Sequence, residues 1–173
     1  AVLNLGIGGN RVLADGLGPS GLSRFDRDVL SQSGVTHLII LEGVNDLGVL
    51  NREKPQDAQM NGWMAKDLIG AYASMVAKAR ARGIKAIGAT ILPYGGSAYY
   101  RPPAEAEAAR QTINAWIRAP GNFDAVIDWD AALRDPARPT HLLPAYDNDG
   151  LHPNMAGYKA MADAVPLSLF ESR

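Results

Sequence analysis

Short apolar runs alternate with longer amphipathic stretches along the chain. Four runs have the length of strands and lie at residues 1–6, 36–41, 84–91 and 125–129. Residues 36–41 are almost continuously apolar, which is typical of a strand that helices cover on both faces. We therefore predict four strands, the first of which begins with no preceding linker.

The stretches between these runs carry apolar residues three and four positions apart, which is the spacing of one helix face. This pattern predicts helices near residues 22–30 and 62–82 and a third helix after Pro103. The polar segment around Pro55 is predicted to be a long loop that leads into the second helix.

A final helix is predicted to start near Asn154, a good N-cap residue, and to run toward Phe170. Pro166 should bend or split it. Strands and helices therefore alternate throughout, which predicts a parallel sheet between two helix layers. With no internal repeat or domain boundary in the sequence, we expect one α/β/α domain over residues 1–173.

Composition and charge narrow the classes of partner. The 17 basic and 18 acidic residues nearly cancel, and no basic run supports a nucleic-acid or anionic-membrane partner. The sequence has no cysteine, so neither disulfides nor thiolate catalysis is available. No apolar stretch approaches the roughly 18 residues of a membrane span. We expect a soluble protein. Its compartment is unknown from the sequence, and it would be secreted if a signal peptide preceded residue 1.

Residue types that carry chemistry follow the predicted strand ends. In open parallel sheets, ligands bind outside the carboxyl ends of the strands. Four loops of this kind should meet at one edge of the sheet: Gly8-Gly9-Asn10, Glu42-Gly43-Val44-Asn45-Asp46, Pro93-Tyr94-Gly95-Gly96-Ser97, and Asp149-Gly150-Leu151-His152-Pro153 before the last helix.

Among the three histidines, His152 has the context of an acid–base catalyst. Asp149 lies three residues before it in a glycine-containing turn. A carboxylate beside an imidazole fixes its tautomer and stabilises the imidazolium. His37 opens an apolar strand and is interpreted as structural, and His141 as a loop residue. Taken alone, an Asp-x-x-His pair also fits an ordinary hydrogen bond within a loop.

Asn45 is a candidate donor to a developing oxyanion. Gly43 allows a sharp turn after a buried strand, so the Asn45 amide can point into the cleft, with the backbone N–H of Gly9 as a second donor. The other interpretation, that Asn45 caps the next element or bridges two loops, stays open at this point.

Taken together and in order, these blocks resemble those of the SGNH (GDSL-like) hydrolases, and the helical segments between them resemble bacterial GDSL-like esterases. The resemblance implies a flavodoxin-like parallel sheet in a three-layer α/β/α sandwich. It also implies that Gly9 and Asn45 form the oxyanion hole, that His152 is the general base and that Asp149 orients it. No metal or cofactor is implied.

The sequence departs from the family pattern at its start. The family's Gly-Asp-Ser block, on its first strand, would lie upstream of Ala1. By resemblance, that strand would sit between the first two strands of the present sequence, in a five-stranded sheet. We therefore expect an N-terminally incomplete domain, inactive alone, that an upstream segment or a separate peptide completes.

The function that follows is hydrolysis of short acyl esters or acetylated carbohydrates through an acyl-enzyme, with the nucleophilic serine upstream of residue 1. Asn10, Tyr94 and Ser97 are possible substrate-binding residues. Ser97 is a poor substitute nucleophile, because it lacks the strand-to-helix elbow of exposed serine nucleophiles.

Three alternatives remain beside the esterase. The first is a non-catalytic binding domain of the same fold, which the missing serine motivates. The second is a nucleotide-binding protein, but Arg11 stands where the dinucleotide fingerprint has glycine. The third is a calcium loop starting at Asp147, but Tyr158 occupies the position of the bidentate glutamate.

Overall fold

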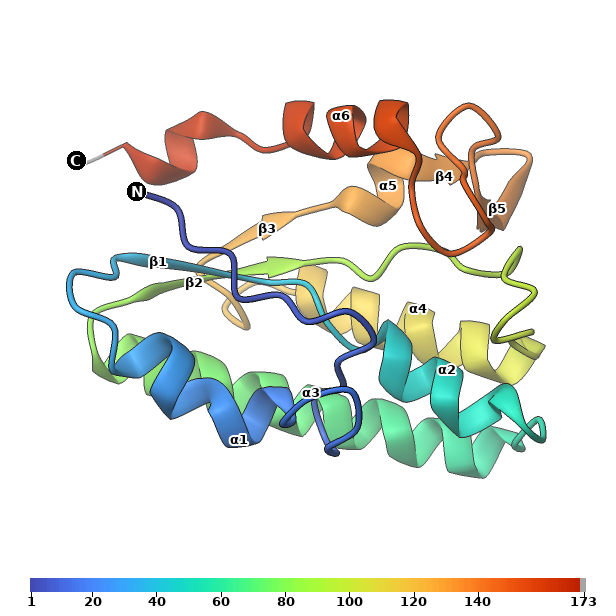
Figure 1. The fold of residues 1–173 in the computed structure, drawn as a ribbon, viewed down its shortest axis with the longest axis horizontal. Coiled ribbons are helices and arrows are strands. Elements are labelled where there is room, and N and C mark those ends of the chain that lie inside the picture. Colours follow the sequence, from blue (N-terminus) through green and yellow to red (C-terminus); the bar gives the residue numbers. More distant parts are fainter. Residues whose placement is uncertain (172–173) are drawn as a thin grey trace.

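The computed structural model describes residues 1–171, and Figure 1 shows a sheet between two layers of helices. Within this range the central sheet has three parallel strands in the order β1-β2-β3: β1 (His37–Ile40), β2 (Lys85–Ala89) and β3 (Ala125–Ile127). In the register of the sheet, Ile39 lies opposite Ile87, and Ile87 opposite Ala125. The predicted fold class, a parallel sheet in an α/β/α sandwich, is confirmed.

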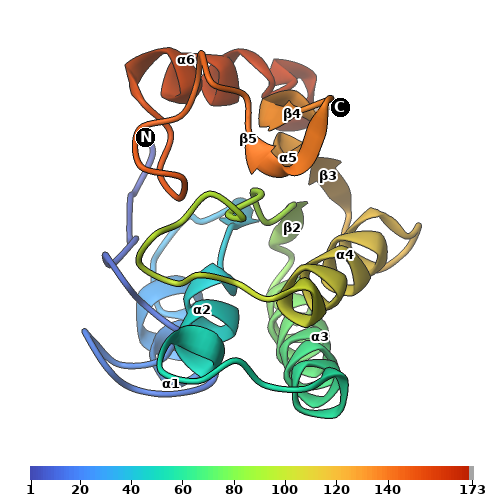
Figure 2. The ribbon, with the colours of Figure 1, turned by 90° about the vertical axis from the view of Figure 1, so that its right-hand side faces the viewer.

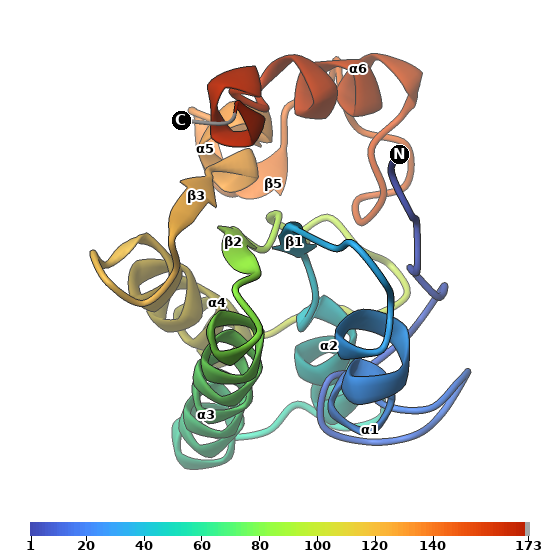
Figure 3. The same cartoon turned by 90° about the vertical axis from the view of Figure 1, so that its left-hand side faces the viewer.

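The two helix layers cover opposite faces of the sheet, as the views from either end show (Figures 2 and 3). On one face lie α1 (Gly21–Phe25) with its π-helical continuation η1 (Asp26–Leu30), α2 (Val44–Arg52), α3 (Ala58–Ala81) and α4 (Ala104–Arg118). On the other lie α5 (Trp129–Leu133), α6 (Met155–Asp163) and the 3-10 turn η2 (Leu167–Phe170).

Local sequence explains where the principal helices begin and end. Asp57 caps α3, because its Oδ1 accepts the backbone N–H of Met60 at 2.9 Å, and Gly83, with φ +71°, follows its end. Asn154 caps α6 in the same way through the N–H of Gly157, as predicted. Pro166 separates α6 from η2, so the predicted split of the last helix is also confirmed.

The main core lies between the sheet and the layer of α1 to α4. The inner face of α3 supplies much of it, with Leu68, Tyr72, Met75 and Val76 almost fully buried. A second, smaller core lies under α6 and joins it to a hairpin that the sequence analysis did not predict, β4 (Arg134–Asp135) and β5 (Arg138–Leu142).

A buried arginine ties α4 to the carboxyl edge of the sheet. Arg110 is fully buried and donates to the carbonyl of Ile91 and to the Asp130 carboxylate, each at 2.7 Å. Because Ile91 follows β2, this contact fixes the segment that leaves the central strand toward the candidate site.

Two predictions about elements were wrong. Residues 1–6 form no strand, because their backbone groups join no ladder within residues 1–171: the Leu5 carbonyl accepts from the Arg24 guanidinium, and the Gly6 N–H donates to the Asn4 side chain. Val2, Leu3 and Leu5 are accordingly exposed. The expected long loop before α3 contains a helix, α2, whose Leu47 is fully buried in the core.

None of the helices within residues 1–171 has the length and apolar character needed to cross a bilayer.

Candidate active site

Loops that are far apart in the sequence enclose a cavity of about 250 Å³ beyond the carboxyl ends of β1 and β2. Three predicted site residues, Gly9, Asn45 and His152, line it together. The rest of the lining is largely apolar and includes Ile7, Leu41, Val44, Ile91, Leu92 and Met161.

His152 and Asp149 are paired as the sequence suggested. The Asp149 Oδ2 lies 2.9 Å from the His152 Nδ1, and its Oδ1 accepts the backbone N–H groups of His152 at 2.7 Å and Leu151 at 3.0 Å. These backbone N–H groups and the imidazole hold the pKa of Asp149 below its ordinary value. An ionised carboxylate at Nδ1 requires the proton on that nitrogen, so Nε2 is the basic atom of the ring.

A backbone-to-backbone contact holds the loop that carries this pair. Gly150 has φ +78°, and a Cβ there would lie 2.2 Å from the carbonyl carbon and oxygen of Gly96. Gly95 in turn donates its N–H to the carbonyl of Thr140 on β5 at 2.7 Å. These close backbone contacts at Gly150 and Gly95 therefore determine how closely the loop that carries His152 packs against the segment after β2.

The Asn45 side chain bonds in two directions at the start of α2. Its Nδ2 donates to the backbone carbonyl of Asn10 at 2.8 Å, and its Oδ1 accepts the Tyr100 hydroxyl at 2.7 Å. Gly43, with φ +99°, makes the turn into the helix, and a Cβ there would lie only 2.6 Å from the Tyr72 hydroxyl. Both interpretations of Asn45 therefore have a structural counterpart, because it bridges two loops and also lines the cavity.

Gly9 lies in a tight turn that a carboxylate of α2 helps to hold. It has φ +72°, and the Asn10 N–H closes the turn on the carbonyl of Ile7 at 3.1 Å. Two residues further on, the backbone N–H of Val12 donates to the buried Asp46 carboxylate at 2.9 Å. The loop after residue 6 is thereby attached to the helix that begins beside Asn45.

The three possible substrate-binding residues lie outside the cavity lining. Asn10 is buried, and its side chain donates to the carbonyl of Pro19 and accepts from the Arg24 guanidinium. Tyr94 and Ser97 are also buried, with 1 % and 3 % of their surfaces exposed. Direct contact of these side chains with a substrate in the cavity is not supported by their positions, since neighbouring protein groups cover them.

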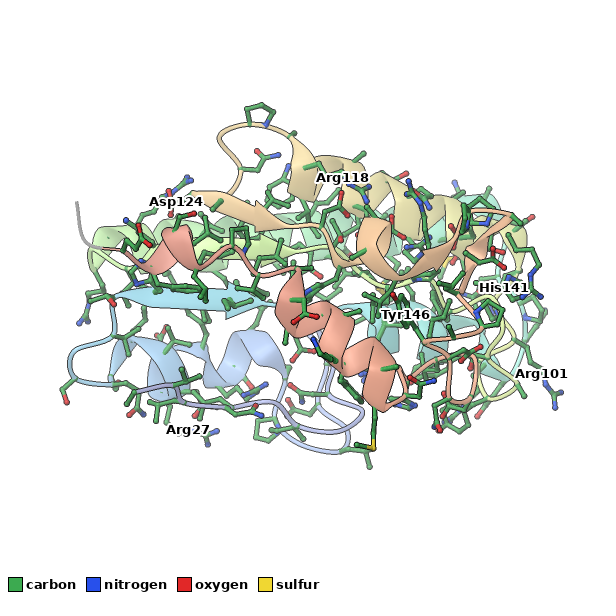
Figure 4. All side chains as sticks on the ribbon, turned by 90° about the horizontal axis from the view of Figure 1, so that it is seen from above. Arg27, Arg101, Arg118, Asp124, His141 and Tyr146 are labelled. Atoms are coloured by element: carbon green, nitrogen blue, oxygen red, sulfur yellow. The ribbon has the colours of Figure 1, made fainter. Side chains whose placement is uncertain are left out.

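The other two histidines lie outside the cavity lining. The Nδ1 of His37 lies 2.9 Å from the Thr36 hydroxyl, and its ring packs edge-on against Phe170. His141 lies on β5 and not in a loop as the sequence analysis expected, at the end of the molecule where Figure 4 also shows Arg101, and its Nδ1 lies 2.8 Å from the Thr140 hydroxyl. Within residues 1–171, no group of three histidine or acidic side chains is placed to hold a metal ion.

Glu42 is a cavity residue that the sequence analysis gave no role. It lies two residues after the end of β1, and Arg24 approaches its carboxylate at 3.6 Å. Burial raises the pKa of Glu42 to about 7, despite the opposing charge of Arg24. An acidic residue at the end of an apolar strand is the signal that could have identified it.

Comparison with known proteins identifies the family of the chain. The model of the GDSL-like lipase/acylhydrolase family matches residues 1–160. The chain belongs to this family. A search among curated proteins gave no match.

Solved structures of GDSL-like proteins share the fold. A GDSL-like lipase from Bacteroides thetaiotaomicron is 27 % identical with a TM-score of 0.65, over 85 % of this chain and 70 % of that one. A G-D-S-L family protein from Desulfitobacterium hafniense is 24 % identical, with a TM-score of 0.58 over 83 % and 70 %.

A Bacteroides fragilis protein assigned to the acylhydrolases is 24 % identical, with a TM-score of 0.60 over 83 % of this chain. The present chain spans 64 % of that protein's length, which is less than two thirds.

Proposed function

We propose that the protein is a serine ester hydrolase that acts through a covalent acyl-enzyme. The observation that carries the proposal is the meeting of Gly9, Asn45 and His152, from three distant loops, around one cavity. Two possible oxyanion donors and a carboxylate-paired imidazole are the groups that acyl transfer requires.

In the proposed reaction, a serine Oγ attacks the ester carbonyl carbon while the His152 Nε2 takes its proton. The Gly9 backbone N–H and the Asn45 Nδ2 stabilise the negative oxygen of the tetrahedral intermediate. The alcohol leaves with the proton from His152. Water, deprotonated by His152, then attacks the acyl-enzyme, His152 returns that proton to the serine Oγ as its bond to the acyl carbon breaks, and the acid is released. Asp149 keeps the proton on Nδ1 throughout, which leaves Nε2 to act as the base.

We place the nucleophilic serine on an additional strand paired with the free edge of β1. Within the described residues β1 is paired on one edge only. Ile39 and Leu41 leave 39 % and 37 % of their surfaces exposed there, although apolar side chains on an internal strand are normally covered. No serine of residues 1–171 lines the cavity, so a strand at this edge is our proposed source of the nucleophile.

Short acyl groups are the substrates that the cavity favours. Its volume of about 250 Å³ is below the roughly 300–1,000 Å³ of sites that hold drug-sized ligands. Its apolar lining, with Leu41, Val44 and Met161, suits a small hydrocarbon group better than a charged one. Simple short-chain esters and acetylated carbohydrates both meet this description.

A non-catalytic domain that binds such an ester is the second candidate, and the lack of a serine among the described cavity residues favours it. Labelling separates the two candidates. The protein from its complete coding sequence is treated with a fluorophosphonate and digested, and the modified residue is located by mass spectrometry. A labelled serine outside residues 1–173 supports the hydrolase. No labelling together with retained binding of short-chain esters supports the binding domain.

Hydrolysis of p-nitrophenyl acetate tests the role of His152. The same protein with His152→Ala should lose nearly all turnover, by about 10⁶-fold if the loss resembles that in a well-studied serine protease. His141→Ala is the matched control, because His141 is a histidine outside the cavity lining. Full activity in His152→Ala, with unchanged circular dichroism, would exclude His152 as the base.

A further inference from the structure

A tyrosine hydroxyl bonds to the amide that would stabilise the oxyanion. Tyr100 donates to the Asn45 Oδ1 at 2.7 Å, although 55 positions separate the two residues in the chain. Tyr100 lies in the segment between β2 and α4, outside the cavity lining, with 3 % of its surface exposed. It therefore reaches the cavity only through Asn45.

Only one assignment of donors and acceptors is consistent with the hydrogen bonds around Asn45. The backbone carbonyl of Asn10 can only accept, so the amide nitrogen of Asn45 must face it. The amide oxygen then faces Tyr100, whose hydroxyl must donate. This arrangement fixes which end of the Asn45 amide points to each side, and it leaves the second Nδ2 hydrogen free for the cavity.

Neighbouring groups pack closely around the Tyr100 ring and restrict the position of its hydroxyl. Gly48, one turn after Asn45 on α2, lies against the ring face, and a Cβ there would be 2.5 Å from ring carbons. The ring of Tyr94 packs edge-on at a centroid distance of 6.2 Å. The backbone N–H of Tyr100 donates to the Ser97 Oγ at 3.2 Å. Tyr94 and Ser97 thus both contact Tyr100 and support its position.

We propose that Tyr100 is a positioning residue that holds the Asn45 amide in the orientation needed for oxyanion stabilisation. The inference rests on the proposed function, because it assigns Tyr100 a part in the same hydrolysis. A donor that is already oriented needs no reorganisation when charge develops in the transition state. A hydroxyl bonded to the amide oxygen also polarises the amide and strengthens its N–H as a donor.

Tyr100→Phe tests the inference in the protein from its complete coding sequence, because it removes the hydroxyl and keeps the ring. With p-nitrophenyl acetate, kcat should fall about tenfold, as expected for the loss of one hydrogen bond, and KM should stay within about twofold. Tyr99→Phe is the matched control, since it removes the neighbouring hydroxyl, which contacts Arg52 on the surface. Thermal unfolding confirms that both variants fold.

A double-mutant cycle with Asn45→Ala separates this inference from the proposed function. Asn45→Ala alone should lower kcat by about 10²–10³-fold, and adding Tyr100→Phe should then have no further effect. Normal kcat in Tyr100→Phe beside a slow Asn45→Ala would overturn the inference and leave the proposed function standing. Normal kcat in Asn45→Ala would overturn the proposed oxyanion hole, and the inference with it.

Nuclear magnetic resonance gives a readout that does not depend on turnover. The two side-chain amide protons of Asn45 should shift in Tyr100→Phe and keep their positions in Tyr99→Phe. An unchanged Asn45 amide pair in Tyr100→Phe would show that the hydroxyl does not hold this side chain, and would overturn the inference.

Discussion

The Glu42 carboxyl should couple the stability of the protein to pH near neutrality. Its side chain, 21 % exposed, lies at the cavity after β1. Burial is the largest cause of its raised pKa, the negative Asp46 adds to the effect, and Arg24 opposes it. Ionisation of the Glu42 carboxyl therefore costs more free energy in the folded protein than in the unfolded chain.

The size and sign of this effect follow from the pKa of Glu42. A rise from 4.5 to about 7 in the folded state corresponds to about 3 kcal/mol, since each pH unit is worth about 1.4 kcal/mol. Because the folded-state pKa is the higher one, the favourable contribution is complete below pH 4.5. It is lost as the pH rises through about 7.

Urea denaturation at pH 5 and at pH 8 measures the effect. Glu42→Gln removes the titration. The free energy of unfolding of this variant minus that of the unmodified protein should therefore be larger at pH 8 than at pH 5, by up to about 3 kcal/mol. Other titrating groups contribute equally to both proteins and cancel in this difference. Glu53→Gln, at an exposed position, is the control. Parallel pH profiles for Glu42→Gln and the unmodified protein would refute the reasoning.

Two further substitutions test contacts that shape the site. Gly150→Ala should lower the free energy of unfolding by about 1–3 kcal/mol and sharply lower ester turnover, because its Cβ would overlap the Gly96 carbonyl and displace the His152 loop. An unchanged melting temperature and kcat would contradict this. Arg110→Met should lower the free energy of unfolding by about 1–3 kcal/mol, because it removes the buried donor to Asp130 Oδ1, although Arg118 still pairs with Oδ2 at 2.7 Å. A loss below about 1 kcal/mol in urea denaturation would contradict this.

The hydrophobic pattern correctly predicted the elements whose own side chains are buried. Residues 36–41, 84–91 and 125–129 contain β1, β2 and β3, because continuous apolar runs reflect a sheet covered on both faces. Residues 1–6 have a similar pattern but form no strand. A strand depends on the hydrogen bonds of its neighbour as well as on its own residues, and the neighbour is not part of the local pattern.

Helix α2 was missed because its buried face is partly polar. Asp46 and Asn51 are both buried, where an amphipathic pattern would place apolar residues. Asp46 is satisfied by backbone N–H groups such as that of Val12, and Asn51 by the side chain of Asn61. These partners are distant in the sequence, so periodicity alone classed the segment as an exposed loop.

The candidate site divides in the same way between local and long-range information. Asp149 and His152 form a hydrogen bond over three residues, and their spacing was visible in the sequence. The contact of Tyr100 with Asn45 and the place of Glu42 in the cavity depend on how separate loops pack. Sequence order therefore suggested the proposed catalytic groups and Asp149, and only the structure identified the contact of Tyr100 with Asn45 and the place of Glu42.

One short segment links the two halves of the candidate site. Between β2 and α4, Gly96 packs against Gly150 in the loop that carries His152, and four residues later Tyr100 bonds to Asn45. The loop that carries the proposed base and the side chain of the proposed oxyanion donor each contact this segment. Its backbone conformation between Gly96 and Tyr100 therefore sets the separation of the two groups across the cavity. Alignment of the acid–base pair with the oxyanion donors then depends on this segment as much as on the sheet edge from which the loops emerge.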